Sequence, residues 1–562
     1  MKKTILKKYF NKSNLRLSWE RYIRSNKLTK DYYGIKTFGY NLEQNIQNLS
    51  NNIIQEIYSP SRPQKIFIPK PTKTQRTITI LDIEDALIYQ AIANVIATKA
   101  YDDLSRNDNF VFGSVLCPEV KMGTRILRRK EANLFFFKQY LSLYKIFVDS
   151  VNRVIQEDKV SYKFETDITG FFDSISHYNL LDTLSKKFHI EDDILNLLSV
   201  CLNYWSGTIK NLTPGVGIPQ GCTPSFFFAN ILLHDLDNMF ISKAYSYYRY
   251  MDDIRIYGDD EQELIEVLVT IDKFLKGLAL SINSKKTSIE KISEDERENL
   301  LINFNISLPE QYEKTENDNI SQAFNKMAEQ EGIINYDYKN SGFITLNKSE
   351  DIINFWKEEL ICCKKELMGF FNFVNTDNDF EFNKDIKKSE REILNIAYKF
   401  RCALKGLNNF SPFEPDLELL PYWLKILKIY FWRCDQICWV LYYYKNNLTL
   451  KKNAFYLIDY FKFYEWIKFH LFTALNVTQK FSKKELKNIF LKNKVEESMY
   501  TKLATYKLLI FHSKKDEQLF SSIMGEIRKE DNVFLKKQLL YDIERKKKNE
   551  FSFEDILKSL GI

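Results

Sequence analysis

Two short acidic motifs near the middle of the chain constrain its fold more than any other feature. Residues 164–173 read Phe-Glu-Thr-Asp-Ile-Thr-Gly-Phe-Phe-Asp, which predicts a β-strand whose end presents Asp167. Residues 248–253 read Tyr-Arg-Tyr-Met-Asp-Asp, and we expect a β-hairpin there, with strands at 247–250 and 254–257 joined by a tight turn. If these strands belong to one sheet, carboxylates from distant parts of the sequence meet at its end.

Three carboxylates would then converge on a small volume, those of Asp167, Asp252 and Asp253. Unpaired like charges so close together are costly unless hard divalent cations neutralise them. Two such ions about 3.5–4 Å apart support phosphoryl transfer, because one lowers the pKa of an attacking hydroxyl and the other stabilises the leaving pyrophosphate. An Asp-Asp pair alone is more often a solvated turn, so this interpretation depends on the neighbouring motifs.

A glycine-rich motif lies between the two acidic motifs. Residues 215–225 read Gly-Val-Gly-Ile-Pro-Gln-Gly-Cys-Thr-Pro-Ser and lead into an apolar helix expected at 226–240. Glycines let a backbone pass close to a ligand, and the polar side chain of Gln220 lies at the start of the helix. His177, in the turn after the first acidic motif, is more typical of a structural hydrogen-bonding residue than of a catalyst.

A basic hairpin is predicted before the acidic motifs. Alternating β-branched runs at 64–70 and 76–80 flank a polar turn, so Lys70, Lys73 and Arg76 lie at or near the tip. Such a tip is ordinarily a solvated loop, but arginine also offers bidentate donors to a triphosphate.

Helices are expected on both sides of these motifs. Residues 1–60 predict basic amphipathic helices with Leu15, Leu17, Tyr22 and Ile23 on the apolar face, which either pack with a solvated side or guide a nucleic-acid strand. The remaining expectations are a helix at 83–101 capped by Asp82, a helix at 261–277, a short strand at 278–282 and a turn at 283–287.

The overall composition fits a large protein with several domains. The chain has 562 residues and a formal charge of +7, a mild basic bias that permits a nucleic-acid partner; its Arg125, Arg128, Arg129 and Lys130 could meet phosphates or be a solvated helix face. Eight scattered cysteines suggest reduced thiols in a cytoplasm, and Cys434 and Cys438 favour core packing over a zinc site. We expect neither a signal peptide nor a membrane span.

The texture of the sequence changes past about residue 300. Residues 303–340 are polar and predict a linker or insertion, and nearly everything from 349 onward predicts helices. Irregular paired helices, as in an α-solenoid, would fit this pattern. The expected division is an N-terminal helical segment at 1–60, fingers and palm at 61–300, a linker at 301–345 and an all-helical domain at 346–562.

Taken together, the motifs resemble the reverse transcriptase family. The resemblance covers residues 60–290 and includes the fingers motifs around Ile68-Pro69-Lys70 and 81–86. It also includes motif A with Asp167, motif B at 217–221, the Tyr-x-Asp-Asp motif C at 250–253 and motif D at 280–287. It implies an α+β right-hand polymerase core, followed here by an all-α C-terminal domain that resembles helical repeats.

The resemblance also implies roles for matched residues. Asp167, Asp252 and Asp253 would hold two Mg²⁺ ions, with Mn²⁺ as an alternative. The expected nucleotide contacts are Lys70 and Arg76 on the triphosphate, Gln220 on the sugar or base, Phe172 under the sugar to exclude a 2′-hydroxyl, and Lys286 as proton donor to the pyrophosphate.

The order of a polymerase core before a long helical region is similar to the abortive-infection and related defence-associated bacterial reverse transcriptases. This similarity implies a cytoplasmic, oligomeric enzyme of antiphage defence that uses deoxynucleoside triphosphates. Its synthesis would be template-independent, primed by a protein tyrosine, or directed by a noncoding RNA. Two alternatives stay open: a retron-like or group II intron-like RNA-templated enzyme, and a catalytically silent RNA-binding scaffold.

Overall fold

The structure is a computed structural model of the chain, and its described residues form two compact units. The first unit comprises Met1–Lys65 and Ile78–Glu310, and the second comprises Ile66–Thr77 and Gln311–Ile562. The structure describes residues 2–540 apart from 26–30, 119–133, 158, 208–212, 244, 298–333, 338–341, 346–348, 374–379, 383–385, 409–414, 445–447, 477–480, 497, 514–515 and 534. The predicted basic cluster at 125–130 lies outside the described residues.

The first unit opens with the helices predicted for its N-terminal segment. They are α1 (Lys2–Tyr9), α2 (Lys12–Arg24), α3 (Tyr32–Tyr40) and α4 (Leu42–Ile54), and they share one apolar core with α5 (Ile83–Leu104). Leu15, Leu17 and Tyr22 are buried, whereas Ile23 is 37% exposed, so its predicted place on the buried face is wrong. Asn14 ties α2 to α5 by donating from Nδ2 to the Ala91 carbonyl at 3.1 Å.

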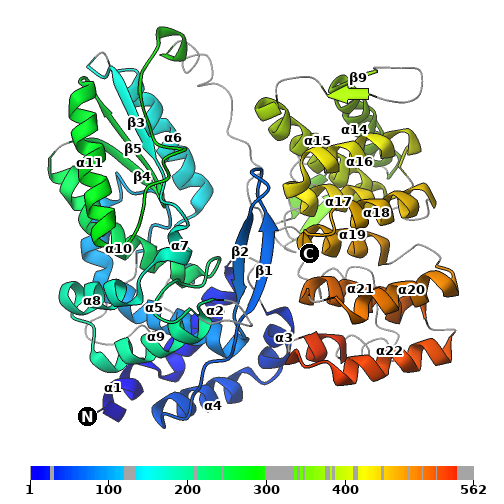
Figure 1. Cartoon of the computed structure of the whole chain (residues 1–562), viewed down its shortest axis with the longest axis horizontal. Helices are drawn as coiled ribbons and strands as arrows, with labels where there is room; N and C mark the ends of the chain where they lie inside the picture. Colours follow the sequence, from blue (N-terminus) through cyan, green and yellow to red (C-terminus); the bar gives the residue numbers. More distant parts are fainter. Residues whose placement is uncertain are drawn as a thin grey trace. The chain divides into compact units, whose positions relative to one another are not determined.

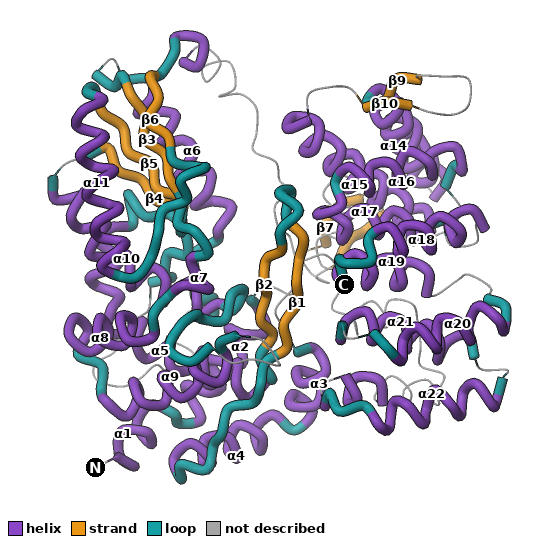
Figure 2. Tube along the Cα trace, in the orientation of Figure 1, coloured by secondary structure: helices purple, strands orange, loops and turns teal. Residues whose placement is uncertain are grey.

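A four-stranded antiparallel sheet forms the centre of the first unit (Figures 1 and 2). Its strands, in spatial order, are β4 (Ser246–Tyr250), β5 (Asp253–Gly258), β3 (Tyr162–Thr166) and β6 (Ser288–Lys291). Phe164 and Ile256 face the core that includes α10 (Thr223–Ser242) and α11 (Glu261–Gly277), while Tyr257 packs with α6 (Tyr140–Ile155) on the other face. Helices thus cover both faces of an antiparallel sheet, which agrees with the α+β architecture expected for this part of the chain.

The short strand expected at 278–282 is wrong. The backbone after α11 turns back instead, because Ala279 takes a φ of 61° and Leu280 N donates to the Leu275 carbonyl at 2.8 Å. That geometry is a left-handed helix cap rather than an extended strand. Ile282 keeps a single bridge to Ile168, and the fourth strand of the sheet forms further on, as β6.

The second unit is largely helical. Its described helices are α14 (Ser349–Gly369), α15 (Ile386–Asn408), α16 (Leu420–Ile429), α17 (Cys434–Tyr442), α18 (Leu448–Tyr460), α19 (Glu465–Asn476), α20 (Lys483–Lys494), α21 (Met499–His512) and α22 (Glu517–Lys529). Cys434 and Cys438 are buried in the core, as expected from their spacing. No helix in the described part of either unit is long and apolar enough to span a bilayer.

Two small hairpins interrupt this helical pattern. Strands β7 (Ile334–Asp337) and β8 (Gly342–Thr345) pair within the segment expected to be a linker. Strands β9 (Phe371–Phe373) and β10 (Phe380–Phe382) pair between α14 and α15. The expectation of an exclusively helical C-terminal domain is therefore wrong at β9 and β10, where aromatic residues favour the extended backbone over the helix.

The predicted basic hairpin is formed by β1 (Gln64–Pro69) and β2 (Gln75–Ile80), and its tip belongs to the second unit. The segment between α18 and α19 holds the backbone of this tip. Tyr464 donates its hydroxyl proton to the Lys73 carbonyl at 3.0 Å, and Glu465 Oε1 accepts from Phe67 N at 3.1 Å. These bonds fix the hairpin backbone and leave the side chain of Lys73 exposed.

One buried carboxyl in α5 makes the stability of the first unit depend on pH. Asp85 Oδ1 accepts from the Tyr58 hydroxyl at 2.5 Å, while Oδ2 accepts from Ser61 N at 2.9 Å and Trp205 Nε1 at 3.1 Å. Burial raises the pKa of Asp85 to about 7 despite these bonds. Because the folded pKa lies above the unfolded value of about 4, the folded state favours the protonated form.

We therefore expect the free energy of unfolding to fall as pH rises from about 4 to 7, by on the order of 4 kcal/mol, and to change no further through this group above that range. Asp85→Asn mimics the neutral carboxyl and should remove this pH dependence. Asp103→Asn, on the same helix, should retain it. Chemical denaturation between pH 4 and 8 measures both; a wild-type slope retained in Asp85→Asn would contradict the assignment.

Candidate active site

The carboxylates of the two acidic motifs lie at one end of the central sheet. Thr166 pairs with Ile254 in the antiparallel register, so Asp167 follows directly beside the turn that joins β4 to β5. That turn consists of Met251 and Asp252. The strand and the hairpin predicted from the sequence are thus confirmed. The residue with a positive φ is Met251, at 57°, rather than either of the aspartates.

Asp252 lies in a partly buried, negatively charged environment. Burial raises the pKa of its carboxyl, and the charges of Asp167 and Asp253 raise it further, while Lys286 opposes them. The register of β3 against β5, which sets Asp167 beside the turn, places the carboxylates of Asp167 and Asp252 at the same end of the sheet. An additional positive charge at this end of the sheet would favour the ionised form of Asp252.

Asp167 has one paired and one unpaired oxygen. Its Oδ2 accepts a hydrogen bond from Lys286 Nζ, whose side chain is 67% exposed, while Oδ1 is buried without a hydrogen-bond partner among the described residues. The backbone carbonyl of Asp167 accepts from Asn283 N at 2.8 Å, which anchors the turn that carries Lys286. A buried carboxylate oxygen without a donor is a position that a cation can satisfy.

Asp253 faces a different partner. Its two carboxylate oxygens accept from Arg255 Nε at 3.2 Å and Arg255 Nη2 at 3.0 Å. Within the described residues, no three carboxylate, histidine or cysteine side chains are arranged closely enough to enclose a metal ion. The joint role of Asp167, Asp252 and Asp253 in metal binding therefore stays a prediction, in which Asp253 would exchange Arg255 for a cation.

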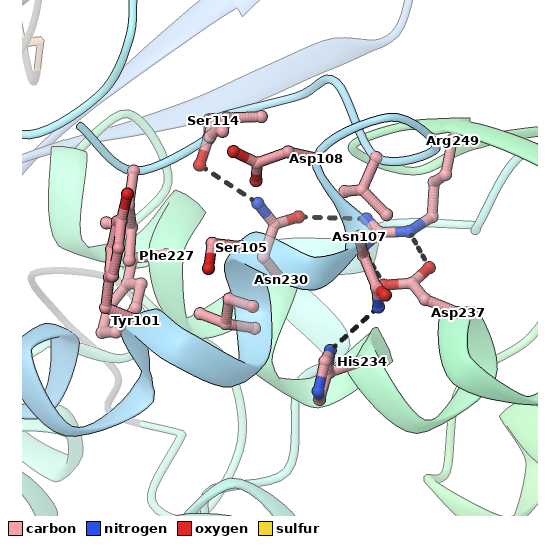
Figure 3. A pocket seen from close by; sticks show the side chains of 14 residues that line it. Tyr101, Ser105, Asn107, Asp108, Ser114, Phe227, Asn230, His234, Asp237 and Arg249 are labelled. Carbon is pink, nitrogen blue, oxygen red and sulfur yellow. Dashed lines mark hydrogen bonds and ion pairs between the residues drawn. The ribbon is translucent and has the colours of Figure 1, made fainter. Parts of the chain in front are cut away.

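A buried ion pair holds the turn from behind (Figure 3). Arg249 is fully buried; its Nε and Nη2 each donate to an oxygen of Asp237 at 2.7 Å, and its Nη1 donates to the Met251 carbonyl at 2.7 Å. Although burial disfavours the charge, Asp237 raises the pKa of Arg249, which keeps the guanidinium protonated. The charged pair thus fixes the backbone of the residue that precedes Asp252.

Asn230 links this pair to a neighbouring loop. Its Oδ1 accepts from Arg249 Nη1 at 3.0 Å, and its Nδ2 donates to the Gly113 carbonyl at 2.7 Å. A Cβ atom at Gly113 would lie 2.5 Å from Met251 N, so only glycine allows this loop to approach the turn. Arg249, Asp237 and Asn230 also line a small cavity (Figure 3).

The glycine-rich motif is anchored to the segment after Asp167. Gly217 N donates to the Ile175 carbonyl at 2.8 Å, and Ile218 N donates to the Phe172 carbonyl at 2.9 Å. His177 Nε2 lies 2.6 Å from the Gly217 carbonyl, which matches its expected structural role. Gly217 has a φ of 89°, where an L side chain would be strained. Motifs A and B are therefore joined by backbone hydrogen bonds.

The predicted nucleotide contacts fall into two groups. Phe172 is buried with its ring 5.2 Å from that of Phe226, and the carbonyl of Gln220 accepts from Thr79 N at 2.9 Å; with Lys286, both belong to the first unit. Lys70 and Arg76 belong to the second unit. The contacts of all five with a nucleotide stay predictions.

Sequence reasoning missed the residues that support the turn. Arg249 alternates with Tyr248 and Tyr250 along β4, so it points to the buried face, where an arginine needs a carboxylate. Asp237 lies in the mostly polar run of residues 234–238 on α10, so its burial has no signal in the local sequence. The alternation along β4 indicates a buried arginine, but it does not identify the carboxylate that pairs with it.

Loss of one partner of the Arg249–Asp237 pair should destabilise the first unit strongly. Arg249→Met leaves Asp237 buried without its cation, with the Tyr247 hydroxyl still donating to it at 2.6 Å, and we expect the free energy of unfolding to fall by about 3–5 kcal/mol. Arg249→Met with Asp237→Leu removes both charges and should recover much of that stability. Chemical denaturation compares the variants. Arg255→Met, which breaks a more exposed pair, is the control and should cost about 1 kcal/mol or less; an equal cost in both single variants would contradict the role of the buried pair.

One comparison with known protein families matches the part of the chain that contains this site. The family "Reverse transcriptase (RNA-dependent DNA polymerase)" matches residues 68–304, which include both acidic motifs and the glycine-rich motif. No curated protein sequence matches the chain.

Solved structures of telomerase show a distant likeness. Apo telomerase from Candida tropicalis, truncated from its C-terminal domain, has 14% identity and a TM-score of 0.30, over 45% of this chain and 56% of that one. Telomerase from Candida albicans with a fragment of telomeric RNA has 11% identity and a TM-score of 0.32, over 73% and 66%. This chain thus spans just over half the length of the former. Likenesses at this level carry no argument, and it is the family match that identifies residues 68–304 as a reverse transcriptase (RNA-dependent DNA polymerase) domain.

Proposed function

We propose that this chain extends DNA by transferring nucleotides from deoxynucleoside triphosphates to a 3′-hydroxyl. The observation that carries the proposal is the placement of Asp167 and Asp252 at one end of the sheet, within the domain that matches reverse transcriptases. The carboxylates of Asp167 and Asp252, at the end of a strand and in the adjoining turn, are suited to phosphoryl transfer, because divalent cations bound between them would offset their mutual repulsion.

Two carboxyl groups at this end of the sheet support a site for divalent cations. Asp167 Oδ1 is buried and accepts no hydrogen bond from the described residues. Burial and the negative charges of neighbouring aspartates raise the pKa of the Asp252 carboxyl, and a bound cation would offset both effects. Asp167, Asp252 and Asp253 would hold two Mg²⁺ ions, or Mn²⁺ in their place. When bound, such ions lower the pKa of the attacking hydroxyl and stabilise the leaving pyrophosphate.

The chain's own side chains would position the nucleotide. Lys286 is exposed beside Asp167, where it can transfer a proton to the leaving pyrophosphate once a cation replaces it at the carboxylate. Phe172 and Gln220 come from segments whose backbones are fixed to each other, so they can hold the sugar and base in one orientation. Lys70 and Arg76, near the hairpin tip, would bind the triphosphate.

We further propose antiphage defence in the bacterial cytoplasm as the setting, with the enzyme acting as a homo-oligomer. The support is the resemblance to defence-associated reverse transcriptases, in which a polymerase core precedes a largely helical region. Incubation of the purified protein with labelled deoxynucleotides, without added nucleic acid, tests the source of template and primer. A product that is sensitive to protease indicates a protein primer. Loss of synthesis after removal of copurified RNA indicates an RNA template.

Asp252→Asn should abolish incorporation of labelled deoxynucleotides in the presence of Mg²⁺, with a loss of about two orders of magnitude or more, because a charged ligand of the metal pair is removed. Asp259→Asn, an exposed aspartate just beyond the far end of β5, is the control and should keep full activity. Polymerisation retained by Asp252→Asn would defeat the proposal. If cells that carry the inactive Asp252→Asn variant kept their resistance to phage, the chain would instead act as an RNA-binding scaffold.

Phe172→Ala should weaken the exclusion of ribonucleotides. Removal of the ring opens space under the sugar, so we expect the ratio of kcat/KM for a deoxynucleotide to that for the matching ribonucleotide to fall by about tenfold or more. Phe226→Leu, which alters the ring that packs against Phe172, separates a packing effect from a direct one. An unchanged ratio in Phe172→Ala, measured on folded protein, would rule out this role.

A further inference from the structure

Five side chains of the second unit form an exposed surface of aromatic rings and lysines. They are Lys428 on α16, Tyr456 and Tyr460 on α18, and Lys462 and Phe463 in the turn that follows α18, and we call them the aromatic–lysine surface. Tyr456 is 54% exposed, Tyr460 is 59% exposed and Phe463 is 79% exposed. Large rings are usually buried, so three exposed rings on one short segment indicate a binding surface.

The rings are held in a fixed arrangement. Tyr456 and Tyr460 lie one helical turn apart with their centroids at 6.2 Å and an interplanar angle of 27°. Beneath them, Tyr460 packs edge-on against the buried ring of Phe461 at 4.8 Å, and Phe461 in turn stacks on Phe431 at 5.8 Å. The exposed rings therefore rest on the core, which lowers the entropy that a ligand must overcome to order them.

Each exposed ring has a lysine beside it. Lys428 Nζ lies 4.8 Å from the centroid of Tyr456 and 5.7 Å from that of Tyr460, and Lys462 Nζ lies 5.0 Å from that of Phe463. The nearest carboxylate along α18, that of Asp459, is paired with Lys492 at 3.4 Å. Positive charge thus alternates with flat apolar rings along this surface.

The surface continues toward the basic hairpin tip. The carbonyl of Phe463 accepts from Gln75 Nε2 at 3.5 Å, and the next residue, Tyr464, donates to the Lys73 carbonyl. These bonds fix the tip, which carries the exposed Lys73, to the turn after α18. A ligand that extends from the aromatic–lysine surface to the tip would meet this lysine as well.

We propose that the aromatic–lysine surface binds single-stranded nucleic acid, with bases stacked on Tyr456, Tyr460 and Phe463 and phosphates against Lys428 and Lys462. Rings interleaved with cations match a flexible strand, because every base has a face that stacks and every nucleotide carries a phosphate. A protein partner fits less well, since lysine is depleted in protein interfaces. This binding goes beyond the proposed catalysis and needs neither nucleotide nor metal.

Fluorescence anisotropy of the full chain with labelled dT20 and rU20, without Mg²⁺ or nucleotides, tests the proposal. Tyr456→Ala, Tyr460→Ala and Phe463→Ala combined should raise Kd about tenfold or more, whereas Tyr456→Phe with Tyr460→Phe should leave it near wild type, because phenyl rings still stack. Leu491→Ala with Val495→Ala, exposed aliphatic residues of the same unit, is the matched control and should not change Kd.

The salt dependence separates the lysines from the rings. Lys428→Ala with Lys462→Ala should lower the slope of log Kd against log salt by about 1.4, since each phosphate of a single strand that no longer meets a lysine accounts for about 0.7. An unchanged Kd in the triple alanine variant would overturn the proposal, as would an equally large rise of Kd in the phenylalanine variants. Preference for dT20 or rU20 identifies the strand as DNA or RNA, and either supports the proposal. Because no polymerisation is measured, failure here leaves the proposed catalysis standing.

Discussion

The geometry of the active end of the sheet depends on one buried charge. The guanidinium of Arg249 cannot be hydrated, so it must be paired, and Asp237 on α10 supplies both acceptors. Its remaining donor is then able to hold the Met251 carbonyl. The pair thereby fixes α10, β4 and the turn to one another. The left-handed backbone of Met251, which precedes Asp252, is held by a guanidinium that cannot exchange its protein partners for water.

The ion pairs of Asp167 and Asp253 are more exposed to water than the buried Arg249–Asp237 pair. Lys286 neutralises Asp167 from an exposed position, and Arg255 neutralises Asp253 at the sheet surface. Both cations can be displaced at lower cost than Arg249, because their side chains remain accessible to water. The contrast suits a site that exchanges protein cations for metal ions and substrate while its backbone stays in place.

Residue alternation predicted much of this, and pairing across elements explains what it missed. The β4–β5 hairpin and α11 follow from local patterns of period 2 and 3.6. The strand expected at 278–282 is wrong because its apolar residues belong to a helix cap. A short run of apolar residues in a helix cap cannot be distinguished from a short buried strand by sequence pattern alone. The Arg249–Asp237 pair joins a strand to a helix, so no local period reports it.

The helical C-terminal region shows the same limit in another form. Tyr456 and Tyr460 recur at helical spacing, just as buried aromatic residues of this unit do, and 15% of the whole chain is aromatic. A sequence pattern therefore cannot tell an exposed pair of rings from a core pair. The difference arises from Phe461 and Phe431, which fill the core beneath and leave the tyrosines outside. Because the core is complete without them, the exposed rings can serve a ligand rather than the fold.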